Sequence, residues 1–79
     1  MDLVDLTKYI VTNLVKDTDA VKVSMTDDNE KIINVTVSEG DIGAVIGRGG
    51  KTANSIRNVV QASAYINNLG KVRVNIDCK

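Results

Sequence analysis

Apolar residues recur at helical spacing near the start of the chain and alternate with polar residues further along it. Within residues 2–15 the apolar positions fall on one helical face: Leu3, Leu6, Ile10 and Leu14, with Val11 beside them. This spacing predicts an amphipathic helix that ends at the polar segment 17–19. Residues 20–25 and 31–38 alternate instead, and this pattern is typical of strands with one buried face.

The two predicted strands are separated only by the polar segment 26–30, so we expect them to pair as an antiparallel hairpin. A third alternating segment, residues 71–77, predicts another strand near the end of the chain. The inward-facing positions of the three strands are apolar throughout: Val21, Val23, Met25, Ile33, Val35, Val37, Val72, Val74 and Ile76.

A broken helical pattern lies between the second and third strands. Asp41 is a predicted N-cap, and Ile42, Val45 and Ile46 then have the spacing of a short helix. Residues 47–50, Gly-Arg-Gly-Gly, interrupt this helix because three of the four are poor helix formers.

Helical spacing resumes at Lys51 and continues to about Asn67, after which Gly70 suits a left-handed position. The apolar stripe of this longer helix consists of Ala53, Ile56, Val60 and Ala64, and a second apolar edge contains Val59 and Ile66. The predicted order is therefore helix, strand, strand, helix, glycine turn, helix and strand.

Three strands covered on one face by three helices make a two-layer α/β (α+β) sandwich. Residues 1–79 are enough for one small domain, which its own core stabilises only marginally. Association with a partner or a second copy is therefore expected to help.

The composition excludes several kinds of site. His is absent and Cys78 is the only cysteine, so we expect no disulfide within the chain, no metal site and no cofactor. Without a His or a nucleophile–base pair, an enzyme is not expected, and Cys78 is interpreted as an incidental thiol. No signal pattern and no apolar run of membrane-spanning length is present, which predicts a cytoplasmic protein without a membrane partner.

The net charge is zero, but the charges are unevenly distributed. Residues 1–41 carry four lysines and nine acidic residues, whereas residues 42–79 carry six basic residues and one acidic residue. Either the two halves mix on the folded surface, or the basic half faces an anionic partner.

The segment 45–52, VIGRGGKT, has the composition of a phosphate-binding loop. Gly50-Lys51-Thr52 matches the end of the nucleotide-binding loop G-x-x-x-x-G-K-[ST], but the first glycine of that motif falls on Val45. A helical pattern also precedes the segment where that motif requires a buried strand. The dinucleotide fingerprint G-x-G-x-x-G fails as well, because its third glycine falls on Thr52.

Gly47-Arg48-Gly49-Gly50 is instead a G-x-x-G loop between two predicted helices. Glycines without a Cβ let a phosphodiester approach the main chain, and the N–H groups that begin the following helix point at the phosphate. Arg48 and Lys51 add positive charge, which Arg57 extends two turns along the helix. This arrangement predicts a site for a nucleic-acid backbone.

The segment VIGRGGKTANSIR resembles the signature of KH domains, in which an apolar pair, a G-x-x-G loop and a helix follow one another. The order of elements along essentially the whole chain resembles a type II KH domain. A free-standing domain of this length is similar to the bacterial KhpA family of small RNA-binding proteins. Many KH signatures have Ile where this chain has Ala53, and the smaller side chain makes the apolar site slightly wider or shallower.

The resemblance implies that the loop clamps the backbone of single-stranded RNA or DNA over about four nucleotides. It implies that Gly43 and Ala44 let bases lie close, and that Val45, Ile46 and Ile56 form the groove floor. These apolar residues fit an ordinary core better than base contacts, because apolar stripes on helices usually face the core, and Gly43 also fits tight helix packing. The scarcity of aromatic residues argues against an RRM domain. The positions assigned to RNA are Gly43, Ala44, Val45, Ile46, Gly47, Arg48, Gly49, Gly50, Lys51, Ile56 and Arg57.

One KH domain with few phosphate contacts binds RNA weakly, and pairing of two domains adds avidity. The resemblance implies a bacterial RNA chaperone or post-transcriptional regulator that acts as a homodimer or with a KhpB-type KH protein. Val59 and Ile66, with Tyr65 nearby, form the predicted association surface. The alternative is a protein-interaction module with a KH fold that has lost RNA binding, and the retained Arg48 and Lys51 speak against it.

Overall fold

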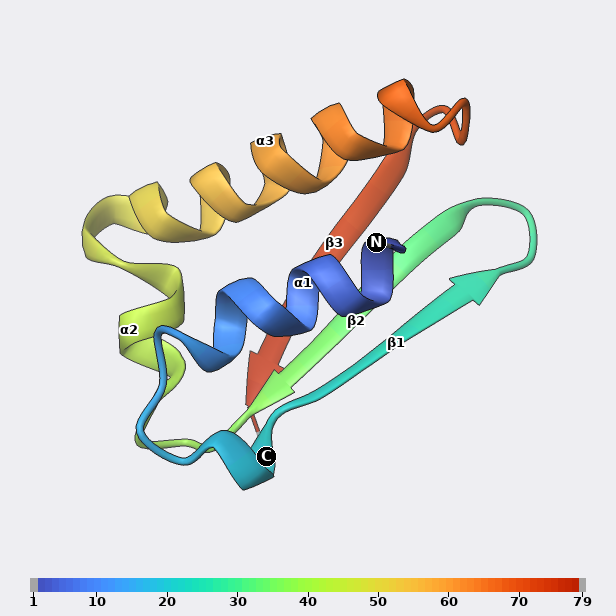
Figure 1. The fold of residues 1–79 in the computed structure, drawn as a ribbon. Helices are drawn as coiled ribbons and strands as arrows, with labels where there is room; N and C mark the ends of the chain where they lie inside the picture. The colour runs from blue at the N-terminus through green and yellow to red at the C-terminus, as the bar shows by residue number, and fades with distance from the viewer. Residues whose placement is uncertain (1, 79) are drawn as a thin grey trace.

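The computed structural model describes residues 2–78, and its helices and strands follow one another in the predicted order (Figure 1). Lys79, which was counted among the basic residues above, lies outside the described residues. The elements are α1 (Leu3–Thr12), η1 (Thr18–Ala20), β1 (Lys22–Asp27), β2 (Lys31–Val37), α2 (Ile42–Ile46), η2 (Arg48–Gly50), α3 (Lys51–Ile66) and β3 (Val72–Cys78). The short turn η1 lies where the sequence predicted only the end of the first helix.

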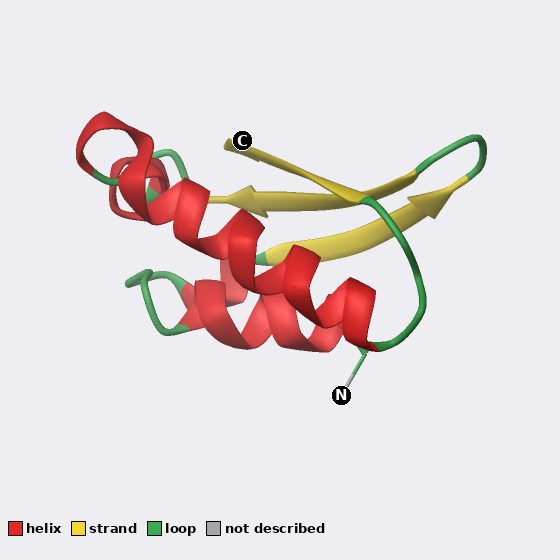
Figure 2. Ribbon diagram, turned by 90° about the horizontal axis from the view of Figure 1, so that it is seen from above, coloured by secondary structure: helices red, strands yellow, loops and turns green. Residues whose placement is uncertain are grey.

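The strands form one sheet of order β1-β2-β3, with β2 in the centre. β1 pairs with β2 antiparallel, as predicted for a hairpin, whereas β3 pairs with β2 parallel. Parallel neighbours need a crossover, and α2, the glycine loop and α3 provide it. The helices lie on one side of the sheet and leave its other face open (Figure 2). The predicted α+β sandwich with the element order of a type II KH domain is thereby confirmed.

The core lies between the sheet and the helices. Ile33, Val35 and Val37 of the central strand are fully buried, and the outward positions between them are only partly covered. α3 contributes its predicted stripe, because each of its buried residues recurs after three or four positions: Ala53, Ile56, Val60 and Ala64. The strand faces and the stripe of α3 were therefore predicted correctly.

The buried face of α1 differs from the predicted one. Leu3, Thr7 and Val11 face the core, whereas Leu6 and Ile10 are only partly buried and Leu14 is 37% exposed. Thr7 is tolerated there because its hydroxyl donates a hydrogen bond of 2.7 Å to the Leu3 carbonyl one turn earlier. Leu6 and Ile10 therefore lie at the edge of the core, beside α3.

Asp41 also differs from its predicted role. It occupies the position before α2, but its side chain makes no capping hydrogen bond to that helix. Its carboxylate instead accepts hydrogen bonds from the backbone N–H groups of Lys16 and Asp17, in the segment that follows α1. The expected local cap is thus replaced by a contact with a distant part of the chain.

Candidate functional site

The glycine loop joins α2 to α3 through backbone conformations that favour glycine. Gly47, Gly49 and Gly50 have φ angles of 76°, 64° and 80°, in the left-handed half of the map. The Gly47 N–H closes α2 by bonding to the Gly43 carbonyl at 2.9 Å, and the Gly50 N–H bonds to the Gly47 carbonyl at 3.2 Å. Arg48 is therefore the one loop residue that presents a side chain, and that side chain is exposed.

The three loop glycines have different surroundings. A Cβ atom on Gly47 would come within 2.9 Å of the Thr52 backbone nitrogen, so this position is closed by the protein itself. A Cβ atom on Gly49 or Gly50 would meet nothing within 4 Å. The main chain at these two glycines is therefore open to a ligand, whereas Gly47 shapes the turn.

α2 has two small residues on its surface beside the loop. Gly43 and Ala44 are exposed, and a Cβ atom on Gly43 would meet no atom within 4 Å. Tight helix packing therefore does not explain the glycine at position 43. At these two positions the surface of α2 carries no bulky side chain, as the approach of a flat nucleobase would require.

The beginning of α3 adds positive character to the loop. Gly50 is its N-cap residue and supplies no side chain, so the N–H groups of the first turn lack a side-chain cap, although that of Lys51 bonds to the Arg48 carbonyl. These N–H groups carry the positive end of the helix dipole. Arg48 and Lys51, which precede and begin this helix, are both exposed. Open main chain, a helix N-terminus and two cations together form a site suited to a phosphate.

Arg57 lies two turns further along α3 and is directed at the edge strand β3. Its Nε donates to the Val74 carbonyl at 3.4 Å, and one terminal nitrogen donates to the Asn54 side-chain oxygen at 3.2 Å. Arg57 thus does not join the loop cations directly. It marks a second basic region, between α3 and β3.

This region is a groove of about 410 Å³ between α3 and β3, which we call the α3–β3 groove. Its lining contains three basic residues and no acidic one: Arg57, Asn58, Gln61, Lys71, Val72, Arg73 and Val74. Gln61 closes one end by donating to the Gly70 carbonyl at 2.9 Å and accepting from the Val72 N–H at 3.0 Å. The sequence prediction assigned neither Lys71 nor Arg73 to the site. The absence of acidic residues from 42 to 76 indicated that basic residues of this segment could belong to it.

Two residues predicted to form the groove floor belong to the core. Val45 and Ile56 are 0% and 2% exposed, so their side chains present almost no surface to a ligand. Both occupy the inward side of their helices, where packing against the sheet covers them. Ile46 is partly exposed and remains available beside the loop.

A second surface, formed by α1 and α3, is apolar. It surrounds a groove of about 370 Å³, which we call the α1–α3 groove, lined by Leu6, Tyr9, Ile10, Leu14, Thr52, Ser55, Ile56 and Val59. Val59 is 48% exposed, and Ile66 is 80% exposed further along α3. From α1 this surface contains the half-buried Leu6 and the exposed Tyr9, together with Ile10, which also packs against the core.

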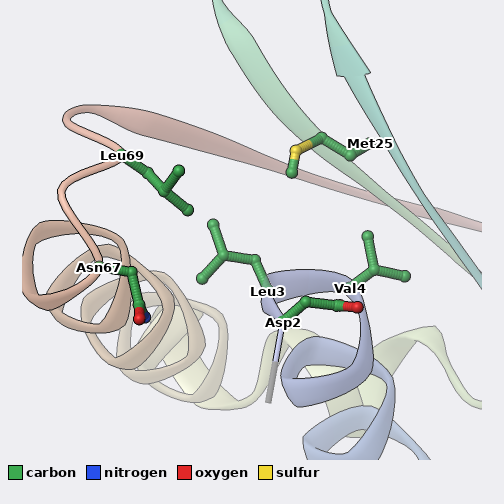
Figure 3. Close-up of a pocket in the computed structure, with 6 residues that line it drawn as sticks. All are labelled: Asp2, Leu3, Val4, Met25, Asn67 and Leu69. Carbon is green, nitrogen blue, oxygen red and sulfur yellow. The ribbon is translucent and has the colours of Figure 1, made fainter.

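A further cavity of about 470 Å³ lies at the other end of the helices, between the start of α1 and the end of α3 (Figure 3). Leu3, Val4, Met25 and Leu69 give it apolar walls, and Asp2 and Asn67 complete its lining. Since no basic residue lines it, it does not suit a phosphate. Among residues 2–78, no cluster of metal-ligating side chains is found, and no helix is long and apolar enough to cross a membrane.

Comparison with known proteins connects this arrangement to a family. Residues 4–76 match the family model described as "KhpA/KhpB, KH domain". RNA-binding protein KhpA of Bacillus subtilis is 40% identical over 62 residues, which cover 77% of this chain and 76% of that protein. RNA-binding protein KhpA of Lactiplantibacillus plantarum is 36% identical over 77 residues, which cover 96% and 89%.

A similar fold is also found in the crystal structure of Era in complex with MgGDPNP and nucleotides 1506–1542 of 16S ribosomal RNA. The TM-score is 0.71, and the match covers 98% of this chain but only 30% of that one. At 12% sequence identity this likeness concerns the fold alone.

Proposed function

The chain belongs to the KhpA/KhpB family of KH domains, and on that premise we propose that it binds single-stranded RNA through its glycine loop. The observation that carries the proposal is the open main chain at Gly49 and Gly50, with exposed Arg48 and Lys51 beside it. The relatives with the same domain are named RNA-binding proteins, which supports RNA as the ligand.

In the proposed complex, the loop holds one phosphate against the main chain at the start of α3. The N–H groups there and the positive end of the helix dipole stabilise the phosphate charge. The neighbouring bases lie over Gly43 and Ala44, where no large side chain obstructs them. Ile46 supplies apolar contact at the rim, while Val45 and Ile56 support this surface from the core.

From the loop, we propose that the RNA follows the α3–β3 groove. Arg57 lies at the middle of α3, and Lys71 and Arg73 extend the basic lining along β3. Arg73 forms an ion pair with Glu30 at 3.6 Å, but both side chains are more than half exposed and the pair is weak. These cations therefore provide further phosphate contacts beyond the clamp.

The test replaces Arg48 and Gly49 together by Asp, which places two negative charges where the phosphate would lie. Asp tolerates left-handed backbone better than most residues, so the fold is expected to persist. We expect an unchanged circular dichroism spectrum and an affinity for a short fluorescent single-stranded RNA that is lower by at least about tenfold.

The matched control is Lys22→Asp with Ser24→Asp, which makes the same change in charge on exposed positions of β1, the strand at the opposite edge from β3. This control is expected to retain most of the RNA affinity. If both double variants bind as tightly as the unchanged protein, the clamp assignment is wrong. If the unchanged protein binds no RNA, the protein-interaction module becomes the better interpretation.

The exposed apolar surface of the α1–α3 groove supports a second part of the proposal, a dimer. Tyr9 and Val59, which line the groove, are 63% and 48% exposed, and an exposed apolar patch of this kind is typical of an interaction surface. A second copy or a KhpB-type KH protein would cover them, and two linked RNA sites would raise the overall affinity. We propose that such a dimer acts in the cytoplasm as a bacterial RNA chaperone or post-transcriptional regulator.

Light scattering at micromolar concentration tests the homodimer. We expect a dimer for the unchanged protein and a monomer for Val59→Asp, because the substitution places a charge in the apolar contact. Ser24→Asp on β1 serves as the control and should remain dimeric. A strictly monomeric unchanged protein would remove self-association and leave the partner KH protein to be tested.

A further inference from the structure

Asp41 has a buried carboxylate whose hydrogen bonds reach across the chain. One oxygen accepts from the Lys16 N–H at 3.1 Å, and the other accepts from the Asp17 N–H at 3.0 Å. The Ser38 hydroxyl donates a third bond of 2.9 Å. The residue is only 6% exposed, so these three donors replace most of its contact with water.

The main chain of the same residue begins α2. Its carbonyl accepts the N–H groups of Ala44 and Val45 at 3.1 and 3.3 Å, which are the first bonds of that helix. An Asp at this position ordinarily uses its side chain to cap the helix as well. Here the side chain is turned to a segment 24 and 25 residues earlier in the chain. Asp41 therefore joins the start of α2 to the segment that follows α1.

α2 needs such an anchor because it is short. It has five residues, far fewer than an isolated helix requires for stability, and Val45 is its one buried residue. Its last residue is followed directly by Gly47, the first residue of the glycine loop. α3 holds the far end of the loop, and the position of the near end depends on how the start of α2 is held.

We propose that Asp41 is a positioning residue for the glycine loop: its carboxylate holds the start of α2 against the segment 16–17 and so fixes the loop for RNA. The RNA part of this inference rests on the proposed function. The anchoring part is a property of the free protein and is measured without RNA.

The ionised carboxylate suits this role. The N–H of Asp17, then that of Lys16, lower the pKa of Asp41, and these bonds outweigh the opposite effect of burial. The Ser38 hydroxyl and the positive charge of Lys16 act in the same direction. The side chain of Asn has only one oxygen. In Asp41→Asn its NH₂ group would therefore face one of the donors from which the carboxylate now accepts a hydrogen bond.

The experiment compares Asp41→Ala and Asp41→Asn with Val23→Ala, which removes partly buried apolar volume from β1, away from α2. Hydrogen exchange of the free proteins is followed by NMR at the amides of residues 42–50. We expect Asp41→Ala to accelerate exchange selectively at Ala44, Val45 and Gly47. It should also weaken binding of a short single-stranded RNA about tenfold, because a tenfold smaller fraction of the protein would have the loop in its binding conformation. Asp41→Asn should lie between Asp41→Ala and the unchanged protein.

Val23→Ala should accelerate exchange throughout the protein and leave the affinity of the folded fraction unchanged. If Asp41→Ala affects residues 42–50 no more than Val23→Ala does, or weakens binding without faster exchange there, the inference is wrong. Should Asp41→Ala not fold, Asp41→Asn and Ser38→Ala are compared with Val23→Ala in the same way. If the unchanged protein binds no RNA, the proposed function fails, and the exchange comparison alone decides the anchoring role.

Discussion

Gly47 lies so close to Thr52 that a Cβ atom on Gly47 would come within 2.7 Å of the Thr52 Cβ. Its φ of 76° is a second reason for glycine, because residues with a side chain rarely adopt it. Gly49 and Gly50 also have positive φ, but the space beside them is empty. One short motif thus contains a glycine that the fold requires and two whose open surface is available to a ligand.

We expect Gly47→Ala to destabilise the protein by about 3 kcal/mol or more, since backbone strain and a steric clash act together. Gly49→Ala should cost only about 1 kcal/mol, the strain of a positive φ. Urea unfolding measures both. Thr52→Ala in the Gly47→Ala background should recover part of the loss. Equal losses at positions 47 and 49 would show that Thr52 moves aside easily.

Gly43→Ala is expected to change stability and RNA binding in opposite directions. A Cβ atom meets nothing there, and alanine favours the helix, so the free energy of unfolding should rise by about 0.5–1 kcal/mol. The added methyl group lies where the proposed bases approach, so RNA affinity should fall. Gly40→Ala is the control, because its surroundings are equally empty and it lies outside α2. Unchanged affinity in Gly43→Ala would remove α2 from the binding surface.

The strands were predicted well because each has one buried face, and such a face appears in the sequence as an alternation of apolar and polar residues. The face of α1 was predicted less well, because periodicity cannot show that a polar residue is inside. Thr7 occupies a core position since its hydroxyl is satisfied within its own helix. Leu6 and Ile10 belong to the predicted buried stripe, yet they are only partly buried, in the groove beside α3.

The residues of the candidate site were found from the G-x-x-G pattern, but their contacts depend on topology. Nothing local in the sequence places β3 parallel to β2, and this pairing brings Lys71 and Arg73 into the α3–β3 groove. The two backbone N–H groups that bond to the Asp41 carboxylate lie 24 and 25 residues away, beyond the reach of any local rule. The sequence therefore predicts the loop, and the fold determines which residues surround and hold it.

Thr7 offers a test of the revised core. Thr7→Val keeps the shape and removes a hydroxyl that bonds to the Leu3 carbonyl of its own helix, so we expect a change in unfolding free energy below about 1 kcal/mol. Thr7→Ser removes a buried methyl group and should cost about 1 kcal/mol. The two variants are compared by their midpoints of urea unfolding, analysed with the same dependence of unfolding free energy on urea concentration. A severe loss in Thr7→Val would mean that the hydroxyl is more important than its methyl group.

The lowered pKa of Asp41 makes the stability of the protein depend on pH at the acid end. Because the folded pKa lies below its ordinary value of 3.8, the contribution of the carboxylate is fully present at higher pH and is lost as pH falls through the folded pKa. The difference in urea midpoint between the unchanged protein and Asp41→Asn should therefore be constant above about pH 5 and shrink below it. A difference that stays constant down to pH 2 would exclude the carboxylate charge as its source.

The salt dependence of binding separates cations that contact phosphate from those that do not. Each phosphate contact on single-stranded nucleic acid adds about 0.7 to the slope of log affinity against log salt concentration. Arg48→Gln and Lys51→Gln should each reduce the slope by about that amount, and Arg57→Gln should do so if the RNA follows the α3–β3 groove. Lys22→Gln, on the exposed strand at the opposite edge of the sheet, should leave the slope unchanged. A smaller slope in Arg48→Gln and Lys51→Gln but not in Arg57→Gln would show that the phosphate contacts are confined to the loop. An unchanged slope in all three variants would show that the RNA backbone lies elsewhere.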